Sequence, residues 1–291
     1  NMLITILRQW GSGYTEIKGN DIHEDSSIRK GYMKFLSPAN INKTLDCLKF
    51  FEELAKQRIV GVSHDILDEN YCTKAFEGNH VMFTICSSGG IHRNVEHAES
   101  STRRVKVRPI PYHHDASGDH KVVISQGANI AMLDQGNKKQ KENVFEFMVK
   151  ITSGKYQAKW CLDTGYFPAS TSALQDPTYQ AFLNNPSDLS DMKTTSHKEA
   201  ADVNTNEYVN SGNWDKFVDP AFNGSATIRD KISDFMHGMF GAGMVAYESG
   251  MTQFENYCKK TLDLIADDLV KNCATNTIKK DWTESYKNLT W

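Results

Sequence analysis

Apolar residues recur along much of this chain at the spacing of α-helices. The clearest segment begins at Ser37-Pro38, where a serine N-cap and a proline in the first turn predict a helix start. Intervals of three or four residues separate the apolar positions that follow, which are Ile41, Leu45, Leu48, Phe51 and Ala55. This spacing predicts an amphipathic helix with one buried face. Shorter helices are predicted over 1–10 and 70–78.

Period-two alternation of apolar residues predicts short strands between the helices. One strand is expected over 80–86, leading into the turn Ser87-Ser88-Gly89-Gly90, and a second around Val105 and Val107. Two more, over 121–124 and 129–133, flank a Ser-Gln-Gly turn. An amphipathic helix and a shorter helix then lead to the turn 164–168. Because strands alternate with helices, the sequence predicts the α/β class.

The last hundred residues begin with a polar stretch and continue into two helical patterns. Residues 184–224 are rich in Asn, Ser, Asp and Thr, which predicts a surface connection. The next helix is expected to end at Gly241-Ala242-Gly243, and its apolar residues are Ile228, Ile232, Phe235, Met239 and Phe240. A closing helix carries Phe254, Cys258, Leu262, Ile265 and Leu269. A polar tail is expected over 276–291, after a helical pair over 225–275.

Composition narrows the classes of function without selecting one. The chain has 291 residues and a formal net charge of −3, so bulk charge gives no reason to expect nucleic acid. No apolar run reaches the roughly 18 residues of a membrane span. The six cysteines form no CxxC pair; Cys47 and Cys258 are expected as buried free thiols, and a disulfide stays unassigned. The chain opens on Asn1 inside an apolar periodic segment, which suggests a fragment lacking its N-terminal part and any anchor.

Motifs for the commoner chemistries are missing from the sequence. It contains no Walker loop, G-x-G-x-x-G, G-x-S-x-G or H-E-x-x-H. Five histidines fall close together in predicted loops, where solvated side chains are favoured over a metal site: His92, His97, His113, His114 and His120. No carboxylate pair is supported as catalytic. We therefore expect no metal, no cofactor and no enzyme activity.

The remaining polar and aromatic residues suit the binding of a sugar or polyol. Such ligands need hydrogen-bonding groups around their hydroxyls and an aromatic ring against their C–H face. The expected aromatic residues are Trp10, beside a glycine turn, and Tyr166, between Gly165 and Phe167. Each has an alternative as a packed structural ring. Arg229 near a helix start opposes the macrodipole, so it suggests a binding role, with a plain surface arginine as the alternative.

Strand ends supply the other binding candidates. Ser87 and Ser88 follow the strand predicted over 80–86, and Gly127 and Asn129 flank the turn after 121–124. A glycine lets backbone amides approach a ligand closely because no side chain intervenes. Ordinary turn chemistry is the alternative at all four positions.

Together these motifs resemble the extracellular solute-binding proteins of ABC importers, in the branch that binds sugars and glycerol-3-phosphate-type ligands. The resemblance covers nearly the whole chain and depends on the order of its motifs. They are Ala75–Phe83 leading to Ser87-Ser88, Pro109-Ile110-Pro111, Gln126–Ile130, Phe145–Met148, Thr152-Ser153, Gln157–Trp160, Thr164–Pro168, Ser172-Ala173 and Phe222–Arg229. One departure is Gln126-Gly127 where the family usually has Gly-Gly, and another is the high number of cysteines.

The resemblance implies a two-lobed, periplasmic-binding-protein-like fold of type II with the ligand held in a cleft. It places residues 1–183 mainly in the C-terminal lobe, with elements that return to the first lobe, most of which would precede this chain. The ligand positions that carry over are Trp10, Ser87 or Ser88, Gly127, Tyr166 and Arg229. The chain would act as a monomer outside the cytoplasm, periplasmic or lipid-anchored at the cell surface, and deliver a sugar or polyol to membrane permease subunits.

Two other classes of function stay open at the level of sequence. A carbohydrate-active hydrolase would need two carboxylates about 5–10 Å apart across a cleft, and the candidate residues include none. A surface adhesin could be built on the same scaffold. Turnover of chromogenic glycosides would favour the hydrolase, and adhesion to host matrix without binding of a small molecule would favour the adhesin.

Overall fold

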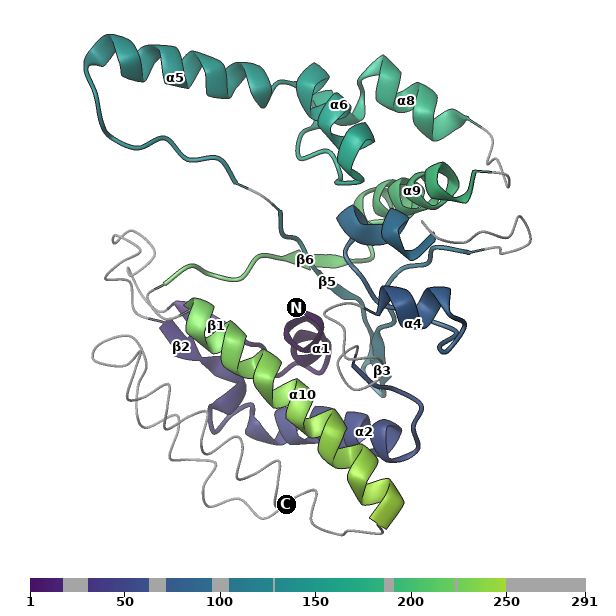
Figure 1. Cartoon of the computed structure of the whole chain (residues 1–291). Coiled ribbons are helices and arrows are strands. Elements are labelled where there is room, and N and C mark those ends of the chain that lie inside the picture. Colours follow the sequence, from purple (N-terminus) through teal and green to yellow (C-terminus); the bar gives the residue numbers. More distant parts are fainter. Residues whose placement is uncertain are drawn as a thin grey trace. The chain divides into compact units, whose positions relative to one another are not determined.

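A computed structural model describes residues 1–17, 31–62, 72–95, 105–127, 129–185, 191–222 and 225–249. The chain divides into two compact units, each built from separate segments (Figure 1). Unit 1 comprises Asn1–Cys72, Pro111–Ile124 and Asp215–Trp291, and unit 2 comprises Thr73–Ile110 and Ser125–Trp214. The chain therefore passes between the units four times.

In its described residues, unit 1 combines three helices with three two-stranded pairs. Its helices are α1 (Met2–Gln9), α2 (Ile41–Lys56) and α10 (Ser225–Ser249), with a short 3-10 turn η2 (Lys34–Leu36). Antiparallel pairs form between β1 (Thr15–Ile17) and β2 (Gly31–Met33), and between β3 (His113–Asp115) and β4 (Gly118–His120). The third pair is parallel and joins β5 (Val122–Ile124) to β6 (Asp215–Phe217). In Figure 1, α10 crosses over α2, against which it packs.

A continuous apolar core holds unit 1 together. The stripe predicted on α2 faces this core: Ile41, Leu45, Leu48 and Ala55 are buried, and Phe51 is partly buried against it. Helices α1 and α10 contribute further large side chains, which include Leu3, Ile4, Ile6 and Leu7 of α1 and Ile228, Ile232, Phe235 and Met236 of α10. Burial of this apolar surface is the main stabilising contribution in unit 1.

Polar side chains inside unit 1 have hydrogen-bond partners that join its segments. Gln9 is 2% exposed, and its amide donates to the carbonyl oxygens of Pro111 at 3.0 Å and Val122 at 3.1 Å. The Thr44 hydroxyl lies 2.6 Å from the Ser12 hydroxyl and donates to the Phe35 carbonyl oxygen at 2.6 Å. Buried polar groups are tolerated when they are satisfied in this way.

Unit 2 consists mostly of short helices. They are α4 (Thr73–Glu77), the 3-10 helix η3 (Ser88–Val95), α5 (Lys138–Ile151), α6 (Gly154–Thr164), α7 (Thr171–Leu174), α8 (Pro177–Asn184), α9 (Met192–Asp202) and the π-helical stretch η4 (Val203–Asn210). Several begin at a side-chain cap: Asn137 before α5, Ser170 before α7, Asp176 before α8 and Asp191 before α9. Each cap satisfies a backbone N–H that the helix leaves free.

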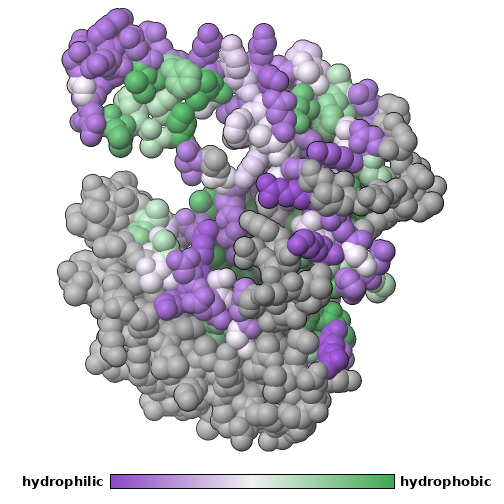
Figure 2. Space-filling model, viewed as in Figure 1, coloured by the Kyte–Doolittle hydropathy of each residue, from purple (hydrophilic) through white to green (hydrophobic). Residues whose placement is uncertain are grey.

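The buried apolar cluster of unit 2 is small. It contains Ala158, Cys161, Tyr179 and Ala201, with Leu162, Leu174, Phe182 and Leu183 packed around it. Helix α5 buries no side chain and exposes Val144, Phe145, Phe147 and Val149. Figure 2 shows this hydrophobic surface gathered over α5. Other exposed large apolar residues of unit 2 are Met82, Phe83, Ile85, Ile130, Met132, Leu133 and Trp160.

Three strands predicted in unit 2 do not form. Residues 80–86, 105–107 and 129–133 are not assigned to strands in the described part of the chain. The carboxylate of Glu199 holds the segment around Val107 by accepting from Val107 N–H at 2.9 Å and Lys106 Nζ at 2.7 Å. Alternation indicates one exposed and one buried face, but a strand also needs a partner for its backbone groups.

Two helix boundaries also differ from the sequence predictions. Helix α2 begins at Ile41 because residues 37–40 form a turn, in which the Ser37 carbonyl oxygen accepts from Asn40 N–H and Ile41 N–H at 2.9 Å each. Helix α10 continues through the expected end at Gly241-Ala242-Gly243 to Ser249, since each glycine costs a helix only about 1 kcal/mol. The range 184–224 contains α9, η4 and β6, so it is more structured than its polar composition suggests.

At the level of class, the prediction of a mixed α/β protein is confirmed, with helices predominating. The domain limits drawn from the sequence stay a prediction, and the helix predicted after residue 249 and the polar tail lie outside the described residues. Within the described ranges, no helix is both long and apolar enough to cross a membrane. Cys47 and Cys161 are free thiols, and Cys47 is buried as expected; Cys258 and Cys273 fall outside those ranges.

Candidate ligand-binding site

Two turns of unit 2 lie against each other and bring together two of the predicted ligand residues. The first turn, Ser87–Gly90, closes with a hydrogen bond from Gly90 N–H to the Ser87 carbonyl oxygen at 3.0 Å and forms the start of η3. The second follows α6, which ends at Gly165 in the left-handed conformation, with φ of 77°. A methyl group on Gly165 would lie 3.2 Å from the Ser88 carbonyl oxygen, so the two backbones are in close contact.

Tyr166 extends from the second turn over the first. A methyl group on Gly89 would lie 2.7 Å from Tyr166 Cε2 and 3.0 Å from Cζ, so one edge of the ring covers Gly89. The side chain nevertheless remains 37% exposed. Ser87 is exposed and Ser88 is half-buried beside it. This region therefore offers serine hydroxyls and a partly exposed aromatic ring, the groups that suit a polyol.

His197 of α9 lies behind the second turn. Its Cδ2 would be 3.7 Å from a methyl group on Gly165, and its ring packs on Phe182 with centroids 5.1 Å apart. Burial lowers the pKa of His197 below its ordinary value of 6.5, and the neighbouring His92 lowers it further. The imidazole is therefore favoured in its neutral form and acts as packing for the turn.

Gly127 and Asn129 form a separate exposed pair in unit 2. The Asn129 side-chain amide donates to the Gly127 carbonyl oxygen at 3.4 Å. A methyl group on Gly127 would meet no atom within 4 Å, so the space beside its backbone is open. The two remain predictions as ligand residues, and the structure groups them with each other rather than with Ser88 and Tyr166.

Trp10, at the end of α1 in unit 1, is packed among aromatic rings. Its indole stacks on the His113 imidazole with centroids 3.8 Å apart and planes 22° apart, and the rings of Phe50 and Phe51 lie at 5.4 and 6.1 Å. The residue is half-buried. A structural role for Trp10 is therefore visible, while its role in ligand binding stays a prediction.

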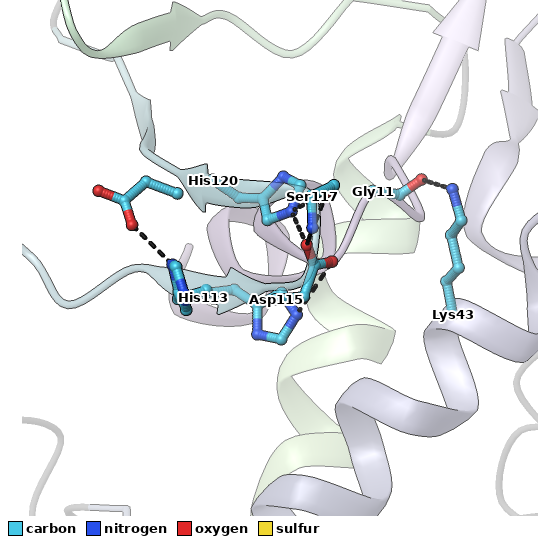
Figure 3. Close-up of polar contacts among 8 residues, drawn as sticks. Gly11, Lys43, His113, Asp115, Ser117 and His120 are labelled. Atoms are coloured by element: carbon cyan, nitrogen blue, oxygen red, sulfur yellow. Dashed lines mark hydrogen bonds and ion pairs between the residues drawn. The ribbon is translucent and has the colours of Figure 1, made fainter.

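Three of the five histidines expected in loops, His113, His114 and His120, are instead fixed on strands β3 and β4. His92 lies in η3, and His97 lies outside the described residues. His113 lies directly opposite His120 across this pair, and both rings face Asp115 (Figure 3). The Asp115 carboxylate lies 3.0 Å from His120 Nε2 and accepts from the Ser117 hydroxyl at 2.6 Å. The Ser117 hydroxyl and His120 hold the pKa of Asp115 well below its usual range, whereas burial lowers the pKa of His113.

The hairpin is not arranged as a metal centre. Among the described residues, no group of three or more His, Cys, Asp or Glu side chains could hold a metal ion.

Figure 3 also shows a contact between α2 and the glycine turn after α1. Lys43 Nζ of α2 donates to the Gly11 carbonyl oxygen at 3.4 Å.

Arg229 pairs with a buried carboxylate of the same unit. Its Nη2 donates to Asp219 Oδ2 at 3.0 Å, and Arg8 of α1 lies 3.5 Å from Asp219 Oδ1. The Asp219 side chain is 9% exposed, whereas that of Arg229 is 40% exposed. The guanidinium of Arg8 also lies 4.0 Å from the centroid of the Phe217 ring. Asp219 therefore links α1 to α10, and it fixes the position of Arg229.

Sequence reasoning missed three groups that define these regions. The Asp115–Gly118 segment is rich in turn residues and could have indicated the hairpin that pairs His113 with His120. Gly89 and Gly165 belong to turns that the sequence predicts, but their mutual contact spans 76 residues of chain and has no local signal. The same holds for Asp219, whose partner Arg8 lies near the start of the chain.

Comparison with known proteins places the chain in a family. It belongs to the bacterial extracellular solute-binding proteins, whose family model matches residues 18–187, more than half of its length. Within known sequences it is similar to the sn-glycerol-3-phosphate-binding periplasmic protein of Pectobacterium atrosepticum, with 30% identity over 115 residues. The resemblance found in the sequence is thus confirmed at the level of the family.

The similarity to that relative is partial. It covers 39% of this chain and 25% of the periplasmic protein, so the chain spans about a quarter of the relative that it matches. No solved structure matches the chain significantly. Membership of this extracellular solute-binding family implies a periplasmic-binding-protein-like fold.

Proposed function

We propose that this chain is the substrate-binding component of an ABC importer and captures a sugar, polyol or glycerol-phosphate-type solute without altering it. The observation that carries the proposal is the family match over residues 18–187. The partial similarity to a periplasmic protein named for binding sn-glycerol 3-phosphate favours the glycerol-phosphate end of this range. Proteins of this family are generally binding components rather than catalysts.

The proposal includes a type II fold whose lobes close on the ligand, with most of the described residues in the C-terminal lobe. The path of the chain supports a two-lobed fold, because the chain passes between two units four times. Two of these passages adjoin the parallel pair β5–β6, where Asp215 N–H also donates to the Lys121 carbonyl oxygen at 2.8 Å. Hinges are formed by a few residues in loops or at the ends of elements, and the ends of β5 and β6 are our candidates for them.

We propose Trp10, Ser87, Ser88, Gly127, Asn129, Tyr166 and Arg229 as ligand residues. The contact between the turns that carry Ser88 and Tyr166 supports this pair most directly. A stacked aromatic ring contributes roughly 1 kcal/mol beyond area burial, and each hydrogen bond adds about 1 kcal/mol net. A handful of each gives micromolar affinity, about −8 kcal/mol.

Isothermal titration calorimetry with sn-glycerol 3-phosphate tests the proposal, with glycerol, glycerophosphocholine and maltose as comparison solutes. We expect micromolar binding of at least one of them and an affinity at least about tenfold weaker in Tyr166→Ala, a loss of about 1.4 kcal/mol. Tyr156→Ala is a matched control, because Tyr156 lies in the same unit and is 44% exposed. A folded protein that binds none of these solutes would overturn the proposal.

The remaining parts of the proposal concern partners and location. The chain would act as a monomer, dock on permease subunits in its closed form, and reside in the periplasm or at a lipid-anchored site on the cell surface. Stimulation of a reconstituted permease by the solute-loaded chain, compared with the chain alone, measures the docking directly.

A further inference from the structure

Gly89 and Gly90 are neighbours in sequence but have opposite surroundings. A methyl group on Gly90 would meet no atom within 4 Å. At Gly89 the same group would lie 2.7, 3.0 and 3.1 Å from Tyr166 atoms Cε2, Cζ and Cδ2. Separations below about 3.0 Å are forbidden contacts between carbon atoms, whose optimal distance is about 3.5–4.0 Å. Only the first glycine of the pair therefore makes room for the tyrosine ring.

We propose that Gly89 is a positioning residue for Tyr166 and sets the orientation in which the ring meets a polyol or glycerol-phosphate-type ligand. The inference deepens the proposed function and rests on it for the identity of the ligand. Gly89 itself need not touch the solute. Its lack of a side chain lets one edge of the ring lie on the backbone, while the rest of the 37%-exposed side chain stays available.

The backbone on the other side of this contact restricts how Tyr166 could respond to a larger residue. Gly165 precedes it in the left-handed region, with φ of 77°, and a methyl group there would be 3.2 Å from the Ser88 carbonyl oxygen. The Tyr166 N–H also bonds the Thr164 hydroxyl at 3.4 Å. Because the backbone of the Gly165–Tyr166 turn is held in place, the clash between a methyl group on Gly89 and the Tyr166 ring is relieved chiefly by rotation of the ring.

A change in ring orientation has a specific consequence for binding. Aromatic stacking on a C–H face depends on the angle of the ring, so a rotated ring loses the contact even though it is still present. Gly89→Ala should therefore imitate the loss of Tyr166, although alanine adds a single methyl group at a position that makes no proposed hydrogen bond.

The experiment compares Gly89→Ala with Gly90→Ala in the full chain, using sn-glycerol 3-phosphate as the calorimetric probe. We expect Gly89→Ala to weaken binding about tenfold, as Tyr166→Ala does, and Gly90→Ala to stay within about twofold of the unaltered protein. In the Tyr166→Ala background, Gly89→Ala should have no further effect, because the methyl group then occupies vacated space. Such non-additivity separates positioning from general loss of structure.

A second readout needs no ligand. It is the denaturant unfolding of the unaltered protein, Gly89→Ala, Tyr166→Ala and the double variant. The Gly89→Ala and Tyr166→Ala changes should again be non-additive, and Tyr166→Phe, which keeps the ring, should leave Gly89→Ala as disruptive as before. If the chain binds no solute but this coupling is found, the proposed function fails and the positioning contact stands. Additive effects, or equal effects of Gly89→Ala and Gly90→Ala, would overturn the positioning role itself.

Discussion

The two units of this protein are stabilised in different ways. Unit 1 buries large apolar side chains in a continuous core, including Phe35, Leu36, Leu48, Ile228 and Phe235. Among the described residues of unit 2, the buried apolar cluster is small and includes two alanines, while many large apolar side chains are exposed. Unit 2 relies instead on helix caps, ion pairs such as Lys106–Glu199 and close contacts between turns.

The difference shows where binding elements can be placed. A large core fixes its residues through many contacts at once, so a local change is resisted by the whole cluster. Turns held by glycine contacts and single hydrogen bonds respond to one added methyl group. The turns that carry the proposed ligand residues Ser88 and Tyr166 lie in the unit with the smaller core, and elements that move on binding generally come from the less stable parts of a protein.

The largest expected effect tests the core of unit 1. Phe235→Ala should destabilise the protein by about 3–5 kcal/mol, because it removes a ring that is 1% exposed and leaves a cavity. Phe145→Ala on α5, where the ring is 60% exposed, should cost no more than about 0.5 kcal/mol. Urea denaturation measures both, and hydrogen exchange shows which unit loses protection. If both variants lost the same free energy of unfolding, the proposed difference in core stability between the two units would be wrong.

Removal of the Asp219 carboxylate should have the next largest effect. Asp219→Asn leaves Arg8 and Arg229 without their common anion, which should cost about 2 kcal/mol. Asp215→Asn, an exposed carboxyl on β6, should change stability by less than about 0.5 kcal/mol. The midpoint of urea unfolding distinguishes them. If Asp219→Asn left the free energy of unfolding unchanged, the stability of unit 1 would depend on its apolar core alone.

A capping change should have a smaller effect that is confined to unit 2. The Asn137 side chain accepts from Gln140 N–H at 3.0 Å, and the Gln140 side chain accepts from Asn137 N–H at 2.9 Å. Asn137→Ala should destabilise the start of α5 by about 1 kcal/mol. Asn143→Ala, in the middle of the same helix, should instead be neutral or slightly stabilising. Amide exchange of residues 138–141 measures the result, and unchanged exchange would count against a capping role.

The smallest expected effect is a pH dependence of unit 2. Burial lowers the folded-state pKa of His197 below 6.5, and His92 lowers it further, although a hydrogen bond with the Cys161 backbone raises it. The unfolded chain therefore takes up the proton first, and stability should fall as the pH drops below about 6.5. His197→Gln should flatten this dependence between pH 7.5 and 5.5, as measured by urea denaturation at each pH. If stability changed with pH as steeply in His197→Gln as in the unaltered protein, the pH dependence would come from other groups.

Local patterns sufficed for the helices but not for the sheets. The three-and-four spacing of Ile41, Leu45 and Leu48 identifies both α2 and its buried face, because this information lies within one turn of helix. The alternation of Val81, Phe83 and Ile85 predicts a strand that the structure does not form. A strand depends on a partner elsewhere in the chain, and nothing in seven residues specifies one.

The same limit applies to the candidate site. Sequence reasoning selected Ser88 and Tyr166 individually, from turn chemistry and aromatic character. It could not show that they meet, because the contact passes through Gly89 and Gly165, which have no side chains to form a pattern. The partner of Arg229 was missed for a similar reason, since an aspartate ten residues away gives no sign that it will be buried.

Segments of the two units alternate along the chain, and this alternation constrains the order in which the units can fold during synthesis on the ribosome. Strand β5 ends at Ile124, but its parallel partner β6 begins at Asp215, after every segment of unit 2 has been synthesised. Unit 2 can therefore fold first, while the N-terminal helices of unit 1 wait for both β6 and α10. Such a long delay before non-local pairing slows folding and leaves apolar surface exposed during synthesis. A chaperone that shields nascent α1 and α2 should therefore raise the yield of folded protein.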